Sequence, residues 1–258
     1  MQNCDYQYKD IISSLRNVGI REGDSIFIHS NLGFFGRLEN AENSDDYGNN
    51  FKNAIFEVIE KTGTLIVPTF SYTFCNNEKF DIKHTPGVCG IFSEHIRKDE
   101  NAIRSNDPNF SICSIGKNAK FFTENCSSHS FGDNSFWERF LMKRGKICNF
   151  NFDSTSTLCH YIEKQINVNY RFDKKFHGQL KIGNNLVKKE FIHFVYDKTK
   201  PQHAPNFEKF HKKAIELKKV KLSDLGRGQI TSISSLDTIN IIKNEMKINP
   251  NFLINGKV

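Results

Sequence analysis

The stretch KICNFNFDSTSTLCHYIEKQ, residues 146–165, decides the fold because it joins a strand pattern directly to a helix pattern. Residues 146–152 form a short apolar run that is typical of a buried strand. Apolar residues then recur at helical spacing over 158–166, and Asp153 before them carries a side-chain acceptor of the kind that starts helices. His160 is therefore expected near the start of a helix, just beyond the end of a strand, where α/β proteins bind ligands.

Strand and helix patterns alternate along the rest of the chain. The expected strands are residues 25–30, 63–72, 110–116 and 226–235. The expected helices are residues 8–18, 51–61, 88–97, 118–125, 135–143, 207–220 and 235–248. This alternation favours the α/β class over an all-helical fold or a β-sandwich.

Residues 178–196 break the alternation. They form two strand patterns joined by Gly-Asn-Asn, which predicts an antiparallel hairpin. We therefore expect a single layered domain of the α/β/β/α type over residues 1–258, with a mixed sheet and an antiparallel insertion at about 172–205.

Composition limits the class of protein. With 258 residues, 38% of them hydrophobic, and 24 phenylalanines, the chain can bury a large core and is not expected to be disordered. It contains no apolar run long enough to cross a membrane, and its N-terminus, MQNCDYQYKD, lacks the layout of a signal peptide. We therefore expect a cytoplasmic protein without a membrane partner.

The cysteines and the net charge limit the kinds of metal, ligand and macromolecule that are expected to bind. Seven cysteines are scattered and form no CxxC pair, so neither a disulfide framework nor a structural zinc site is expected. The net charge of +7 suggests anionic ligands such as phosphate-bearing cofactors. The lysines of the C-terminal third have a helical spacing typical of a solvated face, and no nucleic-acid-binding motif accompanies them, so nucleic acid is not expected as a partner.

Two loops could bind phosphate. HSNLGFFGR, residues 29–37, follows a strand, and its glycines would let backbone N–H groups face an anion; a plain strand-to-helix turn is the alternative. In RSNDPNFS, residues 104–111, Arg104 could grip a phosphate with two hydrogen bonds and Ser105 could add a hydroxyl. Asn-Asp-Pro-Asn is also strong turn chemistry without any ligand.

A third loop and a helix carry candidate acid–base groups. In SHSFGDNSFWERF, Ser135 and Glu138 form a capping-box pattern, which leaves His129 and Asp133 without a structural role. His160 lies three residues before a carboxylate and three residues after Thr157, so the three side chains share one face of the helix.

Glu163 would orient the imidazole of His160 as a general base requires, although a surface His–Glu pair shows the same spacing. Cys159 is adjacent to His160, but neighbours on a helix point about 100° apart, so a shared proton is not favoured. HxxE alone lacks the spacing and partners of a zinc site, and no metal is expected.

Seven segments, taken in order, resemble the motifs of the aminoglycoside 3-N-acetyltransferase family, which transfers an acyl group from coenzyme A (CoA) to a sugar amine. The segments are HSNLGFFG, GTLIVPTFSY, TPGVCG, RSNDPNFS, HSFGDNS, GKICNFNF and TLCHYIE. The resemblance spans nearly the whole chain. Four departures stand out. The serine of the first motif is displaced by one position, and Asp107 stands where the family pattern has a histidine. The loop before the T-x-x-H motif, residues 150–153, lacks the usual glycine, and residues 171–207 are shorter and more basic than usual.

The resemblance implies roles for individual residues. His160 would be the general base and Glu163 its orienting carboxylate in a direct transfer without a covalent acyl-enzyme. The CoA contacts would be Ser30, Asn31, Leu32, Gly33, Gly36, Arg104, Ser105 and Ser111. The acceptor contacts would be Tyr72, His129, Asp133, Thr157 and Arg171.

Charge guides the choice of acceptor. A polycationic aminoglycoside needs a carboxylate-rich cleft, whereas this chain is basic and would suit an amino sugar carried on a nucleotide diphosphate for surface glycan synthesis. The alternatives are a true aminoglycoside acetyltransferase, a catalytically inactive CoA- or nucleotide-binding module, and an enzyme that uses Cys159 as nucleophile.

Overall fold

A seven-stranded mixed sheet forms the centre of the computed structural model, which describes residues 4–256 and so leaves residues 1–3 of the N-terminal stretch outside the description. The strand order is β4-β5-β2-β1-β6-β10-β9, and β1 pairs in parallel with both β2 and β6. Strands β5 and β10 are antiparallel to their inner neighbours. The strands are β1 (Ser25–Phe27), β2 (Thr64–Pro68), β4 (Ile103–Arg104), β5 (Ile112–Gly116), β6 (Lys146–Phe150), β9 (Lys221–Leu225) and β10 (Gly228–Ser234).

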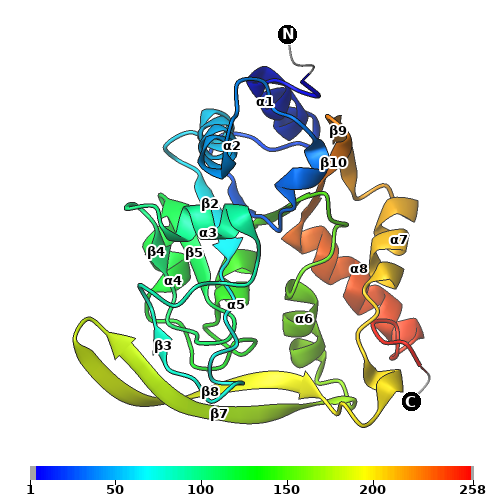
Figure 1. Ribbon diagram of the computed structural model, residues 1–258. Coiled ribbons are helices and arrows are strands. Elements are labelled where there is room, and N and C mark those ends of the chain that lie inside the picture. Colours follow the sequence, from blue (N-terminus) through cyan, green and yellow to red (C-terminus); the bar gives the residue numbers. More distant parts are fainter. Residues whose placement is uncertain (1–3, 257–258) are drawn as a thin grey trace.

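Helices cover both faces of this sheet (Figure 1). Adjacent residues of a strand face opposite sides, so Ile26 packs in one buried cluster and Phe27 in the other. The Ile26 side is covered by α1 (Tyr8–Asn17), α2 (Ser44–Ile59) and α3 (Ile91–Arg97). The Phe27 side is covered by α4 (Ala119–Thr123), α5 (Phe136–Met142), α6 (Leu158–Ile166), α7 (Glu208–Glu216) and α8 (Ser235–Ile248).

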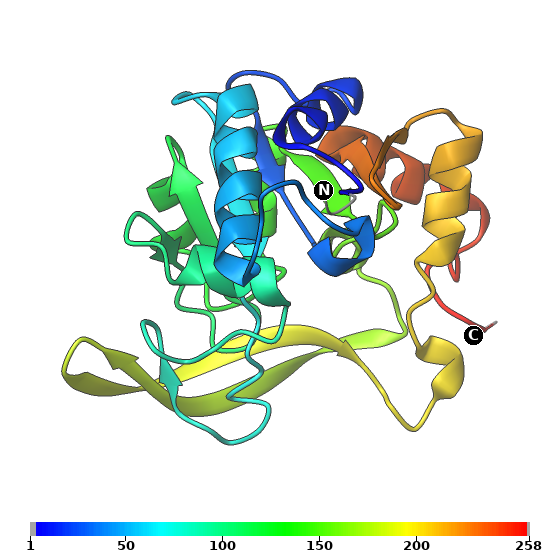
Figure 2. The ribbon, with the colours of Figure 1, turned by 45° about the horizontal axis from the view of Figure 1, so that its top comes forward.

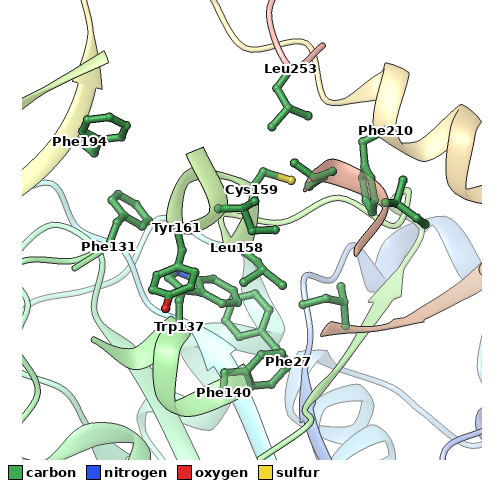
Figure 3. Packing of buried hydrophobic residues seen from close by; sticks show 14 of the residues in the cluster. Phe27, Phe131, Trp137, Phe140, Leu158, Cys159, Tyr161, Phe194, Phe210 and Leu253 are labelled. Carbon is green, nitrogen blue, oxygen red and sulfur yellow. The ribbon is translucent and has the colours of Figure 1, made fainter. Parts of the chain in front are cut away.

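Aromatic side chains dominate the second cluster. Figure 3 shows Phe27 of β1 close to Trp137 and Phe140 of α5, and the rings of Phe27 and Trp137 are centred 4.9 Å apart. Such side chains each bury a large apolar area, so α5 and α6 are held firmly against the sheet. This packing fixes the helix that carries His160.

A second, three-stranded sheet lies apart from the first. It has the order β3-β7-β8, with β3 (Phe80–Asp81), β7 (Arg171–Ile182) and β8 (Asn185–Tyr196). Strands β7 and β8 form the predicted antiparallel hairpin, whose turn contains Gly183 in the left-handed region at φ +59°. The hairpin runs along one end of the molecule, and its tip projects beyond the helices (Figures 1 and 2).

Several elements differ from the sequence-based expectation. Helix α2 begins at Ser44 rather than near Phe51, because the Asn43 side chain accepts hydrogen bonds from the N–H groups of Asp45 and Asp46. Strands β3, β4 and β9 were not predicted, and two short 3₁₀ segments, η1 (Leu32–Phe35) and η2 (Pro201–His203), complete the structure. Within the described part of the chain, no helix has both the length and the hydropathy that a membrane crossing requires.

The carboxyl ends of β1 and β6 position the candidate site. Backbone pairing continues past the strands as a parallel bridge between Ser30 and Phe150. The Asn149 side chain accepts the N–H of His29 and donates to the carbonyl oxygens of Asp153 and Thr155. The loop before α6 is therefore tied to the loop after β1.

Candidate active site

His160 lies in the first turns of α6, and its ring is fixed by Glu163. The distance from His160 Nδ1 to Glu163 Oε2 is 2.7 Å. The His160 side chain is 16% exposed, whereas that of Glu163 is fully buried. Within residues 4–256, Nε2 of His160 has no protein partner. The rings of Phe131 and Phe207 lie 5.5 and 5.1 Å from the imidazole.

The Glu163 carboxylate has two further neighbours. The hydroxyl of Tyr170 donates to Oε1 at 3.0 Å, and Nε of Arg171 lies 2.7 Å from Oε2. Burial by itself would raise the pKa of Glu163, but His160 and Arg171 outweigh it and the pKa is lowered. The carboxylate is therefore ionised and paired in the interior.

The electrostatic surroundings keep the imidazole neutral. Burial and then the positive charge of Arg171 lower the pKa of His160, and the hydrogen bond to Glu163 offsets only part of this. A neutral imidazole whose Nδ1–H is held by a carboxylate has its Nε2 lone pair available. This arrangement can accept a proton from a bound nucleophile.

A pocket of about 870 Å³ opens beside the loop that follows β1. All five loop residues predicted to contact CoA line it: Ser30, Asn31, Leu32, Gly33 and Gly36. Val88 and Ile91, both 68% exposed, also line it. The Ser30 hydroxyl is buried and has no hydrogen-bond partner among the described residues, so it can receive a polar group of a ligand. A neighbouring pocket of about 760 Å³ shares part of this lining.

His29 also lines the larger pocket, and sequence reasoning did not assign it. Its ring lies 5.1 Å from that of Phe27 and 6.3 Å from that of Phe152. Burial lowers the pKa of His29 to about 4, so the ring is neutral. The signal that could have found it is its position at the carboxyl end of a central parallel strand.

Arg104, Ser105 and Ser111, for which CoA contacts remain a prediction, make hydrogen bonds within the protein. The Arg104 guanidinium donates to the carbonyl oxygens of Thr69 and Thr85 and to the Ser111 hydroxyl. The Ser105 hydroxyl accepts the N–H of Ile112 at 3.0 Å. None of the three lines the pocket beside β1. They instead fasten β4 and β5 to the neighbouring loops, which is a structural role.

The residues predicted to contact an acceptor lie in different parts of the structure. Arg171 lies against Glu163, and the hydroxyl of Thr157, at the N-terminus of α6, is buried without a partner in the described part of the chain. His129 bonds Asp173 at 2.9 Å, which places it at the hairpin. Tyr72 is 37% exposed and packs on neighbouring aromatic rings, and Asp133 is exposed in its loop. No contact joins these last two to the His160–Glu163 pair within residues 4–256.

Cys159 is unsuited to be a nucleophile. Figure 3 shows it inside the buried cluster, between Leu158 and Leu253. Burial raises the pKa of its thiol, so the reactive thiolate is disfavoured. The imidazole of His160, the next residue, lies on a different side of the helix. Among residues 4–256, no three histidine, cysteine or acidic side chains are grouped to hold a metal ion.

The described site thus combines an α/β fold with an imidazole that is held by a buried carboxylate on the helix after β6. The model of the aminoglycoside 3-N-acetyltransferase family matches residues 27–247. The chain belongs to this family, whose members are CoA-dependent N-acetyltransferases, and the resemblance noted in the sequence is confirmed. No curated protein sequence matches it significantly.

Solved structures share the whole fold. An AAC-IIIb binary complex with CoASH has a TM-score of 0.80 at 15% identity, over 94% of this chain and 97% of that one. Sisomicin-bound AAC-VIa has a TM-score of 0.81 at 20% identity, over 94% and 98%. The YokD protein from Bacillus subtilis has a TM-score of 0.74 at 18% identity, over 94% and 99%. These likenesses confirm the predicted α/β fold with mixed sheets.

Proposed function

We propose that this protein is a CoA-dependent N-acyltransferase that moves an acyl group from acyl-CoA to the amino group of an amino sugar. The observation that carries the proposal is the His160 imidazole, neutral and bound through Nδ1 to a buried carboxylate, with Nε2 free. An amine is mostly protonated at neutral pH and must lose a proton to attack a thioester, so a base is required. Family membership supports this reaction class.

The chemistry balances with His160 alone as base. His160 Nε2 takes one proton from the bound ammonium, and the neutral amine nitrogen then attacks the thioester carbonyl. A C–N bond forms, and the second proton on that nitrogen is released to solvent. Glu163 stabilises the imidazolium through the Nδ1–H that it already accepts. The C–S bond then breaks, and the proton held by the imidazole passes to the departing thiolate of CoA.

The pocket beside β1 fits the pantetheine arm of CoA. Its apolar walls include Val88 and Ile91, and the unpartnered hydroxyl of Ser30 can bond an amide of the arm. In the loop that follows, Gly36 at φ +85° allows a backbone turn that a residue with a side chain would strain. We place the CoA donor here and not at Arg104.

Thr157 is the proposed donor to the oxyanion of the tetrahedral intermediate. Its hydroxyl is buried without a partner among the described residues, and it lies one helical turn before His160. A donor held in place before charge develops stabilises the transition state more than the ground state. Thr157→Val should therefore lower kcat more than it changes KM, and Thr157→Ser should retain most of the activity.

Two acceptor classes have specific support. Family membership and the sisomicin-bound relative favour an aminoglycoside amine. The net charge of +7 favours an amino sugar on an anionic carrier such as a nucleotide diphosphate. The carboxylates near His160 also offer little to a polycation, since Glu163 is paired with Arg171 and Asp173 is paired with Lys164 and His129.

Release of CoA thiol, measured with acetyl-CoA and each acceptor class, tests the proposal. Turnover of kanamycin-type amines and not of UDP- or dTDP-linked amino sugars would select the aminoglycoside assignment, and the converse would select the nucleotide-linked one. Ser30→Ala should raise the KM for acetyl-CoA, while Ser13→Ala on the exposed side of α1 serves as the matched control. If the protein binds CoA but acylates no amine, the enzyme proposal is wrong and the protein is a CoA-binding module.

A further inference from the structure

Arg171 has a position that the general-base mechanism does not require. It is the first residue of β7, and it reaches back from the hairpin to α6. Its Nε lies 2.7 Å from Glu163 Oε2, the same oxygen that His160 Nδ1 approaches at 2.7 Å. Two nitrogen groups therefore converge on one carboxylate oxygen in the interior.

The hairpin holds Arg171 in this place. Its Nη1 donates to the carbonyl oxygen of Phe194 at 3.3 Å, and its guanidinium lies 5.7 Å from the ring centre of Tyr196. Arg171 pairs directly with Tyr196 in the β7–β8 register, and its side chain is buried. The position of this positive charge relative to Glu163 therefore depends on the end of the hairpin where Arg171 pairs with Tyr196.

We propose that Arg171 is a positioning residue that keeps Glu163 ionised and His160 unprotonated at neutral pH. Through Arg171, the position of the β7–β8 hairpin then affects the protonation state of His160. With Glu163 negative, Arg171 positive and His160 neutral, the buried cluster has no net charge. Adding a proton to His160 would leave a net positive charge in the interior, which is unfavourable. Without Arg171 that proton would complete a neutral pair with Glu163.

Among residues 4–256, Arg171 is the lysine or arginine that forms an ion pair with Glu163. The titratable and charged groups around the pair are Cys159 on α6, Tyr170 before β7, Asp173 and Lys164, His129 in its loop, and His203 beside Tyr170. Tyr170 is a neutral donor whose pKa is raised by burial and by Glu163. Lys164 is a cation on the same helix, but it is paired with Asp173. Arg171 is thus the group whose removal changes the charge beside Glu163.

The test is an NMR titration of the His160 ring in the free protein, assigned by comparison with His160→Asn. Arg171→Gln should raise the pH at which the His160–Glu163 pair takes up a proton, and Arg171→Lys should restore much of the wild-type midpoint. Lys164→Gln, which removes a cation from α6 without touching Glu163, should leave the midpoint in place. An unmoved or lowered midpoint in Arg171→Gln overturns the proposal.

A second measurement uses the wild-type protein, so it does not depend on whether a variant folds. In the wild-type protein, the Arg171 Nε–H resonance should be protected from exchange and should shift with the same midpoint as the His160 ring. A resonance insensitive to that titration overturns the proposal. The consequence for turnover rests on the proposed function: the acid limb of kcat/KM should move to higher pH in Arg171→Gln, each unit being a tenfold further loss on that limb. A moved NMR midpoint without acyl transfer would refute the function and keep the role of Arg171.

Discussion

Replacing Glu163 by glutamine should destabilise the protein strongly. The change preserves shape but removes the negative charge that faces Arg171 and His160, and it leaves a buried guanidinium without its counter-charge. Removing one partner of a buried ion pair costs about 3–5 kcal/mol. Because the Tyr170 hydroxyl can still donate to the amide oxygen, we expect a loss near the lower end, roughly 3 kcal/mol.

Urea unfolding at pH 7.5, followed by far-UV circular dichroism, measures this loss. The matched control is Glu190→Gln on the exposed hairpin, where Lys175 and His177 are the partners and a loss of about 0–1 kcal/mol is expected. For a chain of this size, a loss of about 3 kcal/mol lowers Tm by roughly 6–12 °C. A Glu163→Gln protein within about 1 kcal/mol of wild type, with an unchanged m-value, would refute the argument.

The pH dependence of this difference follows from the sign of the shift. The pKa of Glu163 is lowered in the folded protein from an ordinary value of 4.5, so folding favours the ionised form. Its contribution is present above pH 4.5 and is lost as the pH falls through the folded-state pKa. The gap between wild type and Glu163→Gln should therefore close on acidification, and a constant gap would show that charge is not its origin.

Three other predictions concern residues outside the Glu163 cluster. Cys159→Ala should retain acyl-transfer activity within about threefold of wild type in steady-state assays, because the thiol is buried and not deprotonated; trapping an acyl group on Cys159 would contradict this. Gly178→Ala should lower the free energy of unfolding by roughly 1–3 kcal/mol, since the new Cβ would lie 2.5 Å from the ring of Phe74; thermal unfolding indistinguishable from wild type would exclude the clash. Stability should fall between about pH 6.5 and 4, because the unfolded chain protonates His29 and His193 while burial lowers the pKa of both in the folded state; urea midpoints that stay flat across that range would argue against it.

Elements with a clear local pattern could be predicted from the sequence. The alternation of strands and helices and the hairpin were read correctly because each depends on hydrophobic spacing or on a turn over a few residues. Strand β9 was not predicted because Lys221–Leu225 is largely exposed and charged, and the strand pairs with β10 at the edge of the sheet. The start of α2 was placed late because Gly48 interrupts the pattern, although Asn43 and Asp46 form a capping box that signals it.

The site was predictable where its parts lie on one helix. His160 and Glu163 are one turn apart, so their spacing alone brings the side chains together. Arg171 comes from another element, and its place beside Glu163 depends on how the hairpin packs, which spacing does not give. Arg104 shows a second limit: an arginine that donates to carbonyl groups of the protein looks the same in sequence as one that binds phosphate.

The measurement closest to the central claim is kcat/KM for acyl transfer by His160→Gln, with acetyl-CoA and the amino sugar that the wild-type protein uses. A general base contributes about 10²–10⁴-fold, so the variant should lose at least a hundredfold while its affinity for CoA and its fold stay unchanged. A variant that transfers the acyl group at close to the wild-type rate would show that another group removes the proton.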